Sequence, residues 1–254
     1  MRTFETEYFK QELFKIFEIN KIDSLLNDEI AEKFALLTEI MLCENEKYNL
    51  TAIKELDKII LLHYADSVAK ASLFEKNATV IDVGCGGGFP SIPLAICRPD
   101  MKITALDSTA KKVNYVDMVS KELALNINAI CARAEEISKV GADNCLREKF
   151  DFATARAVAD LSVLSELCIP FVKQNGKFIV MKGKNGSEEL DRAKDAISIL
   201  GAEIRKVEEF VLVDKADVIY ERVSAVIEKY RHTPTEYPRN FSQIQKKPIK
   251  RNQT

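Results

Sequence analysis

Metal-ligating residues are scarce in this sequence of 254 residues. It holds only two histidines, and its six cysteines lie far apart with no Cys-x-x-Cys pair among them. Structural zinc sites and disulfide frameworks both need closer or denser spacing of these residues. We therefore expect no bound metal, and we expect the cysteines to be reduced and mostly buried.

Long apolar runs are also missing. The stretch 158–172, among the longest, is broken by Asp160, Glu166 and Pro170, whereas a membrane span requires about 18 uninterrupted apolar residues. Residues 1–21 mix Glu, Lys and aromatic side chains and do not form the apolar core of a secretory signal. These absences predict a cytoplasmic protein without a membrane span.

The charge is small overall but unevenly distributed. The composition, 46% apolar and 30% charged, is sufficient for one large domain with a buried core. The net charge of −2 divides into +5 from Arg231 onward, where six Lys/Arg face one Asp/Glu, and −7 on the rest. A basic segment on an acidic body predicts a polyanionic partner.

The hydrophobic pattern changes from helical to alternating along the chain. Apolar residues recur at helical spacing over residues 7–45, with an interruption around 27–28, and again over residues 56–74. Helical segments then alternate with short β-rich runs at residues 79–83, 102–106, 127–131, 150–155, 177–181, 202–213 and 218–227. This alternation predicts an α/β fold with a doubly wound, Rossmann-like, seven-stranded sheet, whose last two strands pair antiparallel at one edge.

These patterns divide the chain into three parts. We expect residues 1–76 to be an N-terminal helical extension packed on the core, and residues 77–230 to be the α/β domain that carries the chemistry. Residues 231–254 contain Pro234, Pro238 and Pro248 between basic residues. This spacing predicts an extended basic tail without an apolar face.

A glycine cluster follows the first predicted strand. Four of the nine glycines fall between Gly84 and Gly88, where they allow a tight turn and close approach of the backbone to a ligand; the alternative is a plain tight turn. A dinucleotide fingerprint would place a third glycine at position 89, which is Phe89. Asp82 is unfavourable beside a pyrophosphate but suits the ammonium and sulfonium groups of S-adenosylmethionine.

Two further acids follow the next strands. Asp107 closes the second strand, where a carboxylate accepts hydrogen bonds from ribose hydroxyls; the alternative is the N-cap of the next helix. Ala134 and Glu135 follow the third strand, where an adenine would lie. The alternative for Glu135 is an exposed carboxylate at a helix start.

Together these segments resemble the ribosomal RNA small-subunit methyltransferase G family, also called glucose-inhibited division protein B. The matching segments are Asn49-Leu-Thr51, His63 with Asp66-Ser67, residues 81–95 with Phe89-Pro90, Leu106-Asp-Ser108, Arg156-Ala157 and Lys182-Gly183. The resemblance implies a class I S-adenosylmethionine-dependent methyltransferase and methyl transfer to N7 of a guanine in 16S ribosomal RNA. The cofactor-binding residues it implies, taken with the glycine loop and Asp82, are Asp82, Gly84, Gly86, Phe89, Asp107, Ser108, Ala134, Glu135 and Arg156.

The tail matches this family only in part. Tyr237-Pro-Arg239 and Lys246-Lys-Pro-Ile249 resemble a basic C-terminal signature. Between them the family commonly has Gly-Thr-Pro, whereas this chain has Phe241-Ser-Gln-Ile244. This difference affects the expected conformation of the tail more than the expected chemistry, because the glycine loop and Arg156 match the family.

Methylation of guanine N7 needs no general base, because N7 carries a lone pair and no proton. The protein must instead align the reacting atoms. The candidate catalytic residues are Arg156, which would position the cofactor or the RNA, and Lys182, which would hold a phosphate. Both follow predicted strands, and the alternative for each is a surface ion pair. His63, Asp66 and Ser67 share one helix face and are interpreted as packing or substrate-pocket residues.

Other functions remain open at this point. The chain has no Asn/Asp-Pro-Pro-aromatic motif after the fourth strand, which argues against methylation of an exocyclic amine, and Cys168 is interpreted as a core residue. The alternatives are a methyltransferase for another RNA or a protein, a non-catalytic ribosome-assembly RNA-binding protein, and an NAD-dependent oxidoreductase. The expected partner is 16S ribosomal RNA or a precursor of the small ribosomal subunit, and the expected oligomeric state is a monomer.

Overall fold

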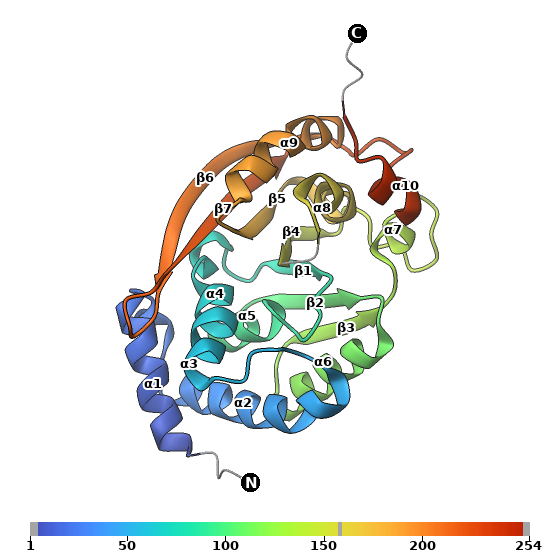
Figure 1. Ribbon diagram of the computed structural model, residues 1–254. Helices are drawn as coiled ribbons and strands as arrows, with labels where there is room; N and C mark the ends of the chain where they lie inside the picture. Colours follow the sequence, from blue (N-terminus) through green and yellow to red (C-terminus); the bar gives the residue numbers. More distant parts are fainter. Residues whose placement is uncertain (1–4, 157–158, 251–254) are drawn as a thin grey trace.

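The computed structural model describes residues 5–156 and 159–250, and it has helices on both faces of one sheet (Figure 1). Ala157, part of one matching segment, and the last tail residues 251–254 lie outside this range. The α-helices are α1 (Thr6–Ile19), α2 (Asp28–Tyr48), α3 (Leu56–Ile59), α4 (Asp66–Val68), α5 (Ser91–Cys97), α6 (Ala110–Glu122), α7 (Ala134–Ile137), α8 (Leu161–Cys168), α9 (Gly186–Ile199) and α10 (Phe241–Lys246).

Seven strands form a single mixed sheet in the order β3-β2-β1-β4-β5-β7-β6. They are β1 (Thr79–Val83), β2 (Lys102–Asp107), β3 (Ile127–Cys131), β4 (Phe150–Arg156), β5 (Val172–Gly183), β6 (Ala202–Val213) and β7 (Ile219–Lys229). The first five pair in parallel, whereas β7 pairs antiparallel with both β5 and β6. The predicted α/β sheet and its antiparallel final pair are confirmed.

Each face of the sheet has its own hydrophobic core. One core joins the N-terminal helices, α5 and α6 to inward residues such as Val80, Ile103 and Phe152. The other joins α8, α9 and the C-terminal tail to the next residues along the same strands, such as Ile81 and Ala153. This alternation follows from the two-residue period of a strand whose two faces are both covered.

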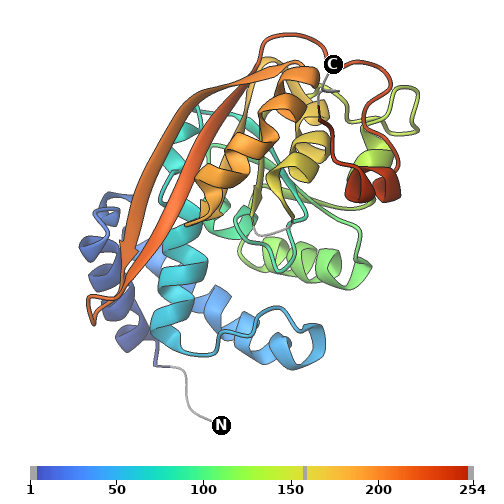
Figure 2. The ribbon, with the colours of Figure 1, turned by 45° about the horizontal axis from the view of Figure 1, so that its top comes forward.

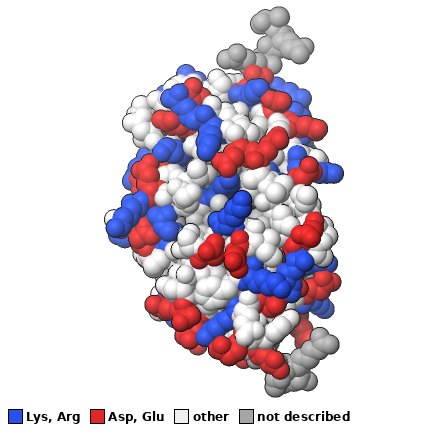
Figure 3. Space-filling model, turned by 90° about the vertical axis from the view of Figure 1, so that its left-hand side faces the viewer, with Lys and Arg blue, Asp and Glu red and all other residues white. Residues whose placement is uncertain are grey.

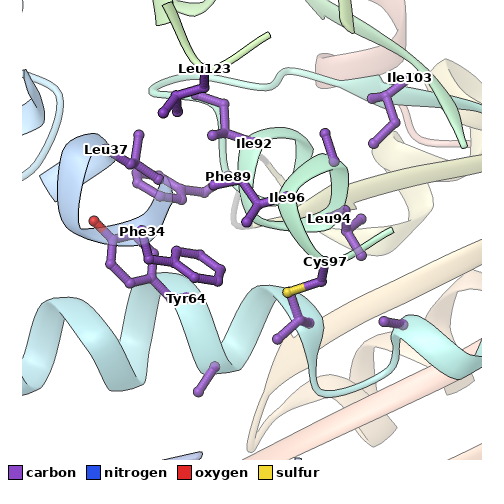
Figure 4. Close-up of a cluster of buried hydrophobic side chains, with 14 of the residues drawn as sticks. Phe34, Leu37, Tyr64, Phe89, Ile92, Leu94, Ile96, Cys97, Ile103 and Leu123 are labelled. Carbon is purple, nitrogen blue, oxygen red and sulfur yellow. The ribbon is translucent and has the colours of Figure 1, made fainter. Parts of the chain in front are cut away.

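The N-terminal helices share a core with the sheet. Phe34 of α2 lies 4.9 Å from Tyr64, ring centroid to ring centroid, and the Tyr64 hydroxyl is 2.7 Å from the Thr38 hydroxyl. Figure 4 shows these side chains meeting those of α5, including Ile96. The N-terminal part therefore packs directly on the α/β core.

A wide turn interrupts the helical stretch predicted at residues 56–74. Residues Ile60–Ala65 form a π-helix between α3 and α4, a feature that is found frequently at functional sites. The turn brings His63 and Asp66 to the edge of the sheet at which the parallel strands end. An amphipathic pattern alone predicts a regular helix here, because the extra residue in a π turn leaves no distinct sequence signature.

The β6–β7 hairpin extends from the edge of the sheet to α1 (Figure 2). The Asn20 side chain donates to the Val213 carbonyl and accepts from the Val213 N–H, at 3.0 and 2.8 Å. Lys215, in the turn of the hairpin, forms ion pairs with Glu12 and Asp57. These contacts connect the two ends of the fold.

The tail differs from the extended segment predicted from its prolines. It forms α10 beside α8, and it buries Ile244 and Ile249 in the second hydrophobic core. The expectation of no apolar face was wrong, because isolated apolar residues lack a periodic pattern yet fit between elements that the sequence places far away.

The cysteines agree only in part with the prediction, and the helix lengths bear on a possible membrane span. All six cysteines are free, and Cys168 is fully buried as predicted. Only Cys85, Cys97 and Cys168 are buried, so the expectation of mostly buried cysteines was wrong for the other half. Over residues 5–156 and 159–250, no helix combines the length and the apolar character needed to cross a membrane.

Candidate active site

Two neighbouring cavities lie where the parallel strands end. The first, of about 310 Å³, extends over the ends of β1, β2 and β3, and the predicted residues that line it are Gly84, Asp107, Ser108, Ala134 and Glu135. The second, of about 340 Å³, lies over the ends of β4 and β5 and the beginning of β7, and it is lined by Leu62, His63, Asp66, Arg156, Met181, Lys182, Gly183 and Arg222. Both sizes suit a small-molecule site, and the position matches the usual ligand-binding edge of such sheets.

The glycine loop contributes Gly84 to the lining of the first cavity. The Gly84 N–H donates to the Leu106 carbonyl at 2.7 Å, and Gly84 has a φ of +77°. Gly88 has a φ of +88°, and a Cβ there would lie 2.3 Å from Cδ1 of Ile92. The backbone therefore turns through conformations that favour glycine, with the next helix packed directly against it.

Asp107 lies at the mouth of the first cavity with its carboxylate held by the backbone. One oxygen accepts from the Gly86 N–H at 3.0 Å, and the other accepts from the Thr109 N–H at 2.8 Å. An ionised carboxylate has about four acceptor sites, so lone pairs remain for two ribose hydroxyls. The N-cap residue of α6 is Thr109, so Asp107 is not the N-cap.

Glu135 lies at the opposite end of this cavity, in the first turn of α7. Its side chain is buried, and its nearest cation is Arg133, with 3.6 Å between Nη1 and Oε1. Glu135 is therefore not the exposed helix-start carboxylate that the sequence left as an alternative. Its position beside Ala134 leaves a carboxylate facing the side of the cavity farthest from the second one.

Asp82 is the most unusual acid of the region. It is fully buried at the end of β1, where one oxygen accepts from the Ser91 N–H and hydroxyl at 3.2 and 2.5 Å. Oδ1 is buried without a hydrogen-bond partner. Burial raises the pKa of Asp82 to about 6, partly opposed by Ser91 and Arg156. A buried carboxylate oxygen without a donor is a place for a cationic group of a ligand.

A carboxylate held by two arginines lines the second cavity. Oδ1 of Asp66 accepts from Nε of Arg222 at 2.8 Å, and Oδ2 accepts from Nη1 of Arg156 at 3.4 Å. Arg156 also donates to the Leu62 carbonyl at 2.8 Å. Asp66 thus fixes two guanidinium groups side by side at one wall.

His63 connects this wall to the glycine loop. Its ring stacks on the Phe89 ring, with 4.4 Å between the ring centroids and 11° between the ring planes. The guanidinium carbon of Arg156 lies 5.5 Å from the centroid of the Phe89 ring. Nε2 of His63 is 2.7 Å from the Thr51 hydroxyl. Burial, with a contribution from Arg156, lowers the pKa of His63 to about 4, so the imidazole is neutral at pH 7.

Lys182 lines the same cavity, but its ammonium is already neutralised. Nζ forms a 2.9 Å ion pair with Glu189 and also donates to the Ala159 carbonyl. Binding a phosphate would compete with both contacts. The assignment of a phosphate to Lys182 stays a prediction, and the sequence alternative of an ion pair describes the contacts that the structure contains.

Asp82 belongs to β1, the strand at the boundary between the two cavities, and it lines neither of them directly. Its pKa is influenced by Arg156 of the second cavity and by Asp107 of the first, and β1 pairs with β2 on one side and β4 on the other. A ligand in the first cavity whose cationic end reached Asp82 would therefore have that end directed toward the second cavity.

Residues 30–217 match the family described as rRNA small subunit methyltransferase G. The chain belongs to this family. It is 43% identical over 227 residues to the ribosomal RNA small subunit methyltransferase G of Clostridium perfringens (strain SM101 / Type A), which covers 88% of this chain and 92% of the relative. The Lactobacillus helveticus relative of the same name is 39% identical over 239 residues, which covers 92% of this chain and 97% of the relative.

Solved structures agree on the fold of this methyltransferase G family member. The crystal structure of M. jannaschii TYW2 in complex with AdoMet is similar with a TM-score of 0.52 and 19% identity, and the likeness covers 65% of this chain and 74% of that one. The fold is that of the class I S-adenosylmethionine-dependent methyltransferases, as predicted.

Sequence reasoning did not single out as site residues two side chains that line these cavities. Arg222 was not singled out, because an arginine in an alternating strand usually faces solvent. Phe241 of α10 also lines the first cavity, although the tail was expected to have no apolar face. Of the other predicted residues, Arg156 and Lys182 line the second cavity. Asp82, Gly86 and Phe89 line neither cavity, although Gly86 donates to Asp107 and Phe89 stacks on His63.

Proposed function

We propose that this chain transfers the methyl group of S-adenosylmethionine to N7 of a guanine in 16S ribosomal RNA, either free or within a precursor of the small ribosomal subunit. When bound, S-adenosylmethionine supplies an electrophilic methyl group on its sulfonium. The family membership supports ribosomal RNA as the substrate, and the two neighbouring cavities support a cofactor and a base side by side.

The first cavity suits the cofactor by its donors and acceptors. Asp107 would hold the ribose, and the end with Ala134 and Glu135 would hold the adenine. The unpartnered Oδ1 of Asp82 would accept from the ammonium of the methionine part. The residues of this chain thus bind the cofactor at three places and direct its methyl-bearing part toward the second cavity.

The observation that carries the proposed reaction is that, among the described residues lining the second cavity, no ionisable side chain is free to act as a general base. Asp66 is engaged by two arginines, the pKa of His63 is about 4, and Lys182 is paired with Glu189. This arrangement fits a nucleophile such as guanine N7, which loses no proton when it is methylated. Arg156 and Arg222 would orient the base and exclude water.

The charge distribution supports a polyanionic partner near the tail. Lys246, Lys247 and Lys250 are exposed on and after α10, where they can contact phosphates. The face of the molecule formed by β6, β7 and α1 shows positive and negative side chains intermixed (Figure 3). We infer that the RNA approaches from the tail side of the cavities and that the acidic remainder of the surface limits binding elsewhere.

We also infer that the protein acts as a monomer in the cytoplasm. All six cysteines are free thiols, as is usual in a reducing compartment. Light scattering of the purified protein at micromolar concentration tests the monomer, since a dimer mass would contradict it.

The reaction is tested on ribosomal RNA from cells that lack this gene. Purified protein and S-adenosylmethionine are incubated with naked 16S RNA and with intact small subunits, and the nucleosides are analysed by mass spectrometry. We expect one new 7-methylguanosine. Binding of S-adenosylhomocysteine without methyl transfer to either RNA would favour a methyltransferase with another substrate, and no cofactor binding at all would favour a non-catalytic RNA-binding protein.

A further inference from the structure

We propose that the tail contributes a residue to the cofactor site, and that Phe241, the first residue of α10, forms the outer wall of its adenosine half. This inference rests on the proposed use of S-adenosylmethionine and goes beyond it, because it assigns a binding residue to a segment that the sequence connected only with RNA.

Phe241 lies beside the first cavity. The Phe241 side chain lines the first cavity together with residues from the ends of β2 and β3 and from α7. The guanidinium carbon of Arg133 lies 5.9 Å from the centroid of the Phe241 ring. Arg133 is the second residue after β3, and Glu135 comes two residues later. Phe241 therefore lies at the end of the cavity assigned to the adenosine, away from Asp82.

A buried ion pair fixes the segment just before Phe241. The Glu166 carboxylate of α8 is fully buried, and it accepts from Nη2 of Arg239 at 2.6 Å and from Nε at 2.9 Å. It also accepts from the Arg239 backbone N–H at 2.8 Å. A carboxylate with no solvent exposure needs these donors, so this contact sets the backbone two residues before Phe241.

A second arginine holds the segment from the other side. Arg147, in the loop after α7, donates to the carbonyls of Thr233, Pro234 and Tyr237, as well as to Ser138. Burial of Ile244 behind α10 adds an apolar contact. The views in Figures 1 and 2 agree in placing α10 beside α7 and α8. The wall is thus an integral part of the fold, with contacts to three separate elements.

An aromatic ring at this place has a specific use. Purines have a flat π-face, and contact with an aromatic side chain contributes strongly to the binding of a base, regardless of the hydrogen bonds at its edge. The cavity offers Leu167 of α8 as a further apolar residue beside Phe241. The adenine therefore has an apolar lining from the C-terminal half of the chain and a carboxylate from Glu135.

The proposed contact between Phe241 and the adenosine is tested by isothermal titration calorimetry with two ligands. For Phe241→Ala we expect about tenfold weaker binding of S-adenosylhomocysteine, a value typical for the loss of an aromatic contact with a base. We expect the same factor for 5′-methylthioadenosine, because it retains the adenosine half and lacks the amino-acid part. Phe241→Tyr should bind like the unmodified protein. The matched control is Gln245→Ala, an exposed residue of the same helix, for which no change is expected.

Two results would overturn the assignment. Unchanged or tighter binding by Phe241→Ala would mean that the ring does not contact the ligand or stands in its way. A loss for S-adenosylhomocysteine but not for 5′-methylthioadenosine would mean that the ring contacts the other half of the ligand. Thermal melting of each variant without ligand identifies any variant that fails to fold, and for such a variant Phe241→Leu provides the same comparison with a smaller change.

Glu166 is assigned here as a positioning residue that acts through Phe241. Glu166→Gln keeps the shape of the side chain and removes its charge, so we expect weaker binding of S-adenosylhomocysteine. In the double variant with Phe241→Ala, the second change should add little, because two residues that act on one contact are not additive. Additive losses would show that Glu166 affects the cofactor by another route and would remove this role.

These experiments separate the inference from the proposed reaction. Normal S-adenosylhomocysteine binding by Phe241→Ala would overturn the role assigned to Phe241 and would not affect the proposed RNA methylation. Failure of the unmodified protein to methylate any ribosomal RNA, with the tenfold loss in Phe241→Ala still present, would overturn the substrate and leave the wall intact.

Discussion

Asp66 and Arg222 lie 156 positions apart in the sequence and meet in an ion pair of 2.8 Å. Asp66 comes from the π turn region of the N-terminal part, and Arg222 comes from β7, the last strand of the sheet. The pair joins the two ends of the fold at the wall of the second cavity, so it contributes both to stability and to the shape of the site.

We expect Asp66→Asn to lower the free energy of unfolding by about 3 kcal/mol, because the two guanidinium groups of Arg156 and Arg222 would lose the carboxylate charge that lies between them. Urea denaturation measures this. The control is Arg205→Gln, whose ion pairs with Glu203 and Glu228 are about half exposed at the arginine and should contribute less than about 1 kcal/mol. A loss for Asp66→Asn no larger than that of the control would contradict the prediction.

Asp82→Asn should stabilise the protein at pH 7 while weakening cofactor binding. Folding raises the pKa of Asp82 from 3.8 to about 6. Ionised Asp82 therefore lowers the free energy of unfolding by on the order of 3 kcal/mol above pH 6. This loss of stability becomes smaller as the pH falls toward 4. Urea denaturation should show a gain for the variant at pH 7 that shrinks at low pH. An equal gain at both pH values would point to a cause other than ionisation.

His63 should act on stability in the opposite direction. Its pKa is lowered from 6.5 to about 4, so between these values the unfolded chain takes up a proton that the folded protein does not. Stability should therefore fall by roughly 3 kcal/mol as the pH drops from 7 to 4. The Asp82 contribution partly offsets this fall in the unmodified protein. In His63→Gln the acid-induced loss should be smaller by this amount, and an unchanged pH profile would refute the assignment.

Charge reversal on the tail should weaken RNA binding without changing the cofactor site. Lys246 and Lys247 are exposed, so Lys246→Glu with Lys247→Glu should reduce the affinity for small-subunit RNA and lower the salt slope of log K by about two. Filter binding at several salt concentrations measures both. The matched control reverses Lys206, an exposed lysine of β6, and equal losses for both variants would reject the tail as the RNA contact.

The sequence predicted the parallel part of the sheet closely, because its strands are short apolar runs separated by helices of clear periodicity. The predicted strand 79–83 coincides with β1, whereas β5 begins at Val172 instead of residue 177. Lys173, Gln174 and Asn175 are polar and exposed, so they give no hydrophobic signal even though β5 begins before them. A strand start that is stabilised by backbone hydrogen bonds alone is not visible in side-chain patterns.

The site was predictable where it follows the chain locally. Gly84 follows β1 directly, Asp107 is the last residue of β2, and Glu135 lies four residues after the end of β3. The parallel arrangement of these strands brings all three to one cavity. Arg222 and Phe241 reach the same edge from the antiparallel strand and the tail. Their positions depend on partners such as Asp66 and Glu166, whose side chains are distant in sequence, so no local spacing indicates them.

The strand order has a consequence for the synthesis of the chain. β6 precedes β7 in the sequence but forms ladder hydrogen bonds only with β7, which lies between it and β5. While the chain emerges from the ribosome, the twelve residues Ala202–Val213 have no neighbour in the sheet until β7 has been translated. The outer edge of β5 stays open for the same time. A nascent chain that pauses between these strands therefore presents two unpaired edges, which are the kind of surface that chaperones protect from aggregation.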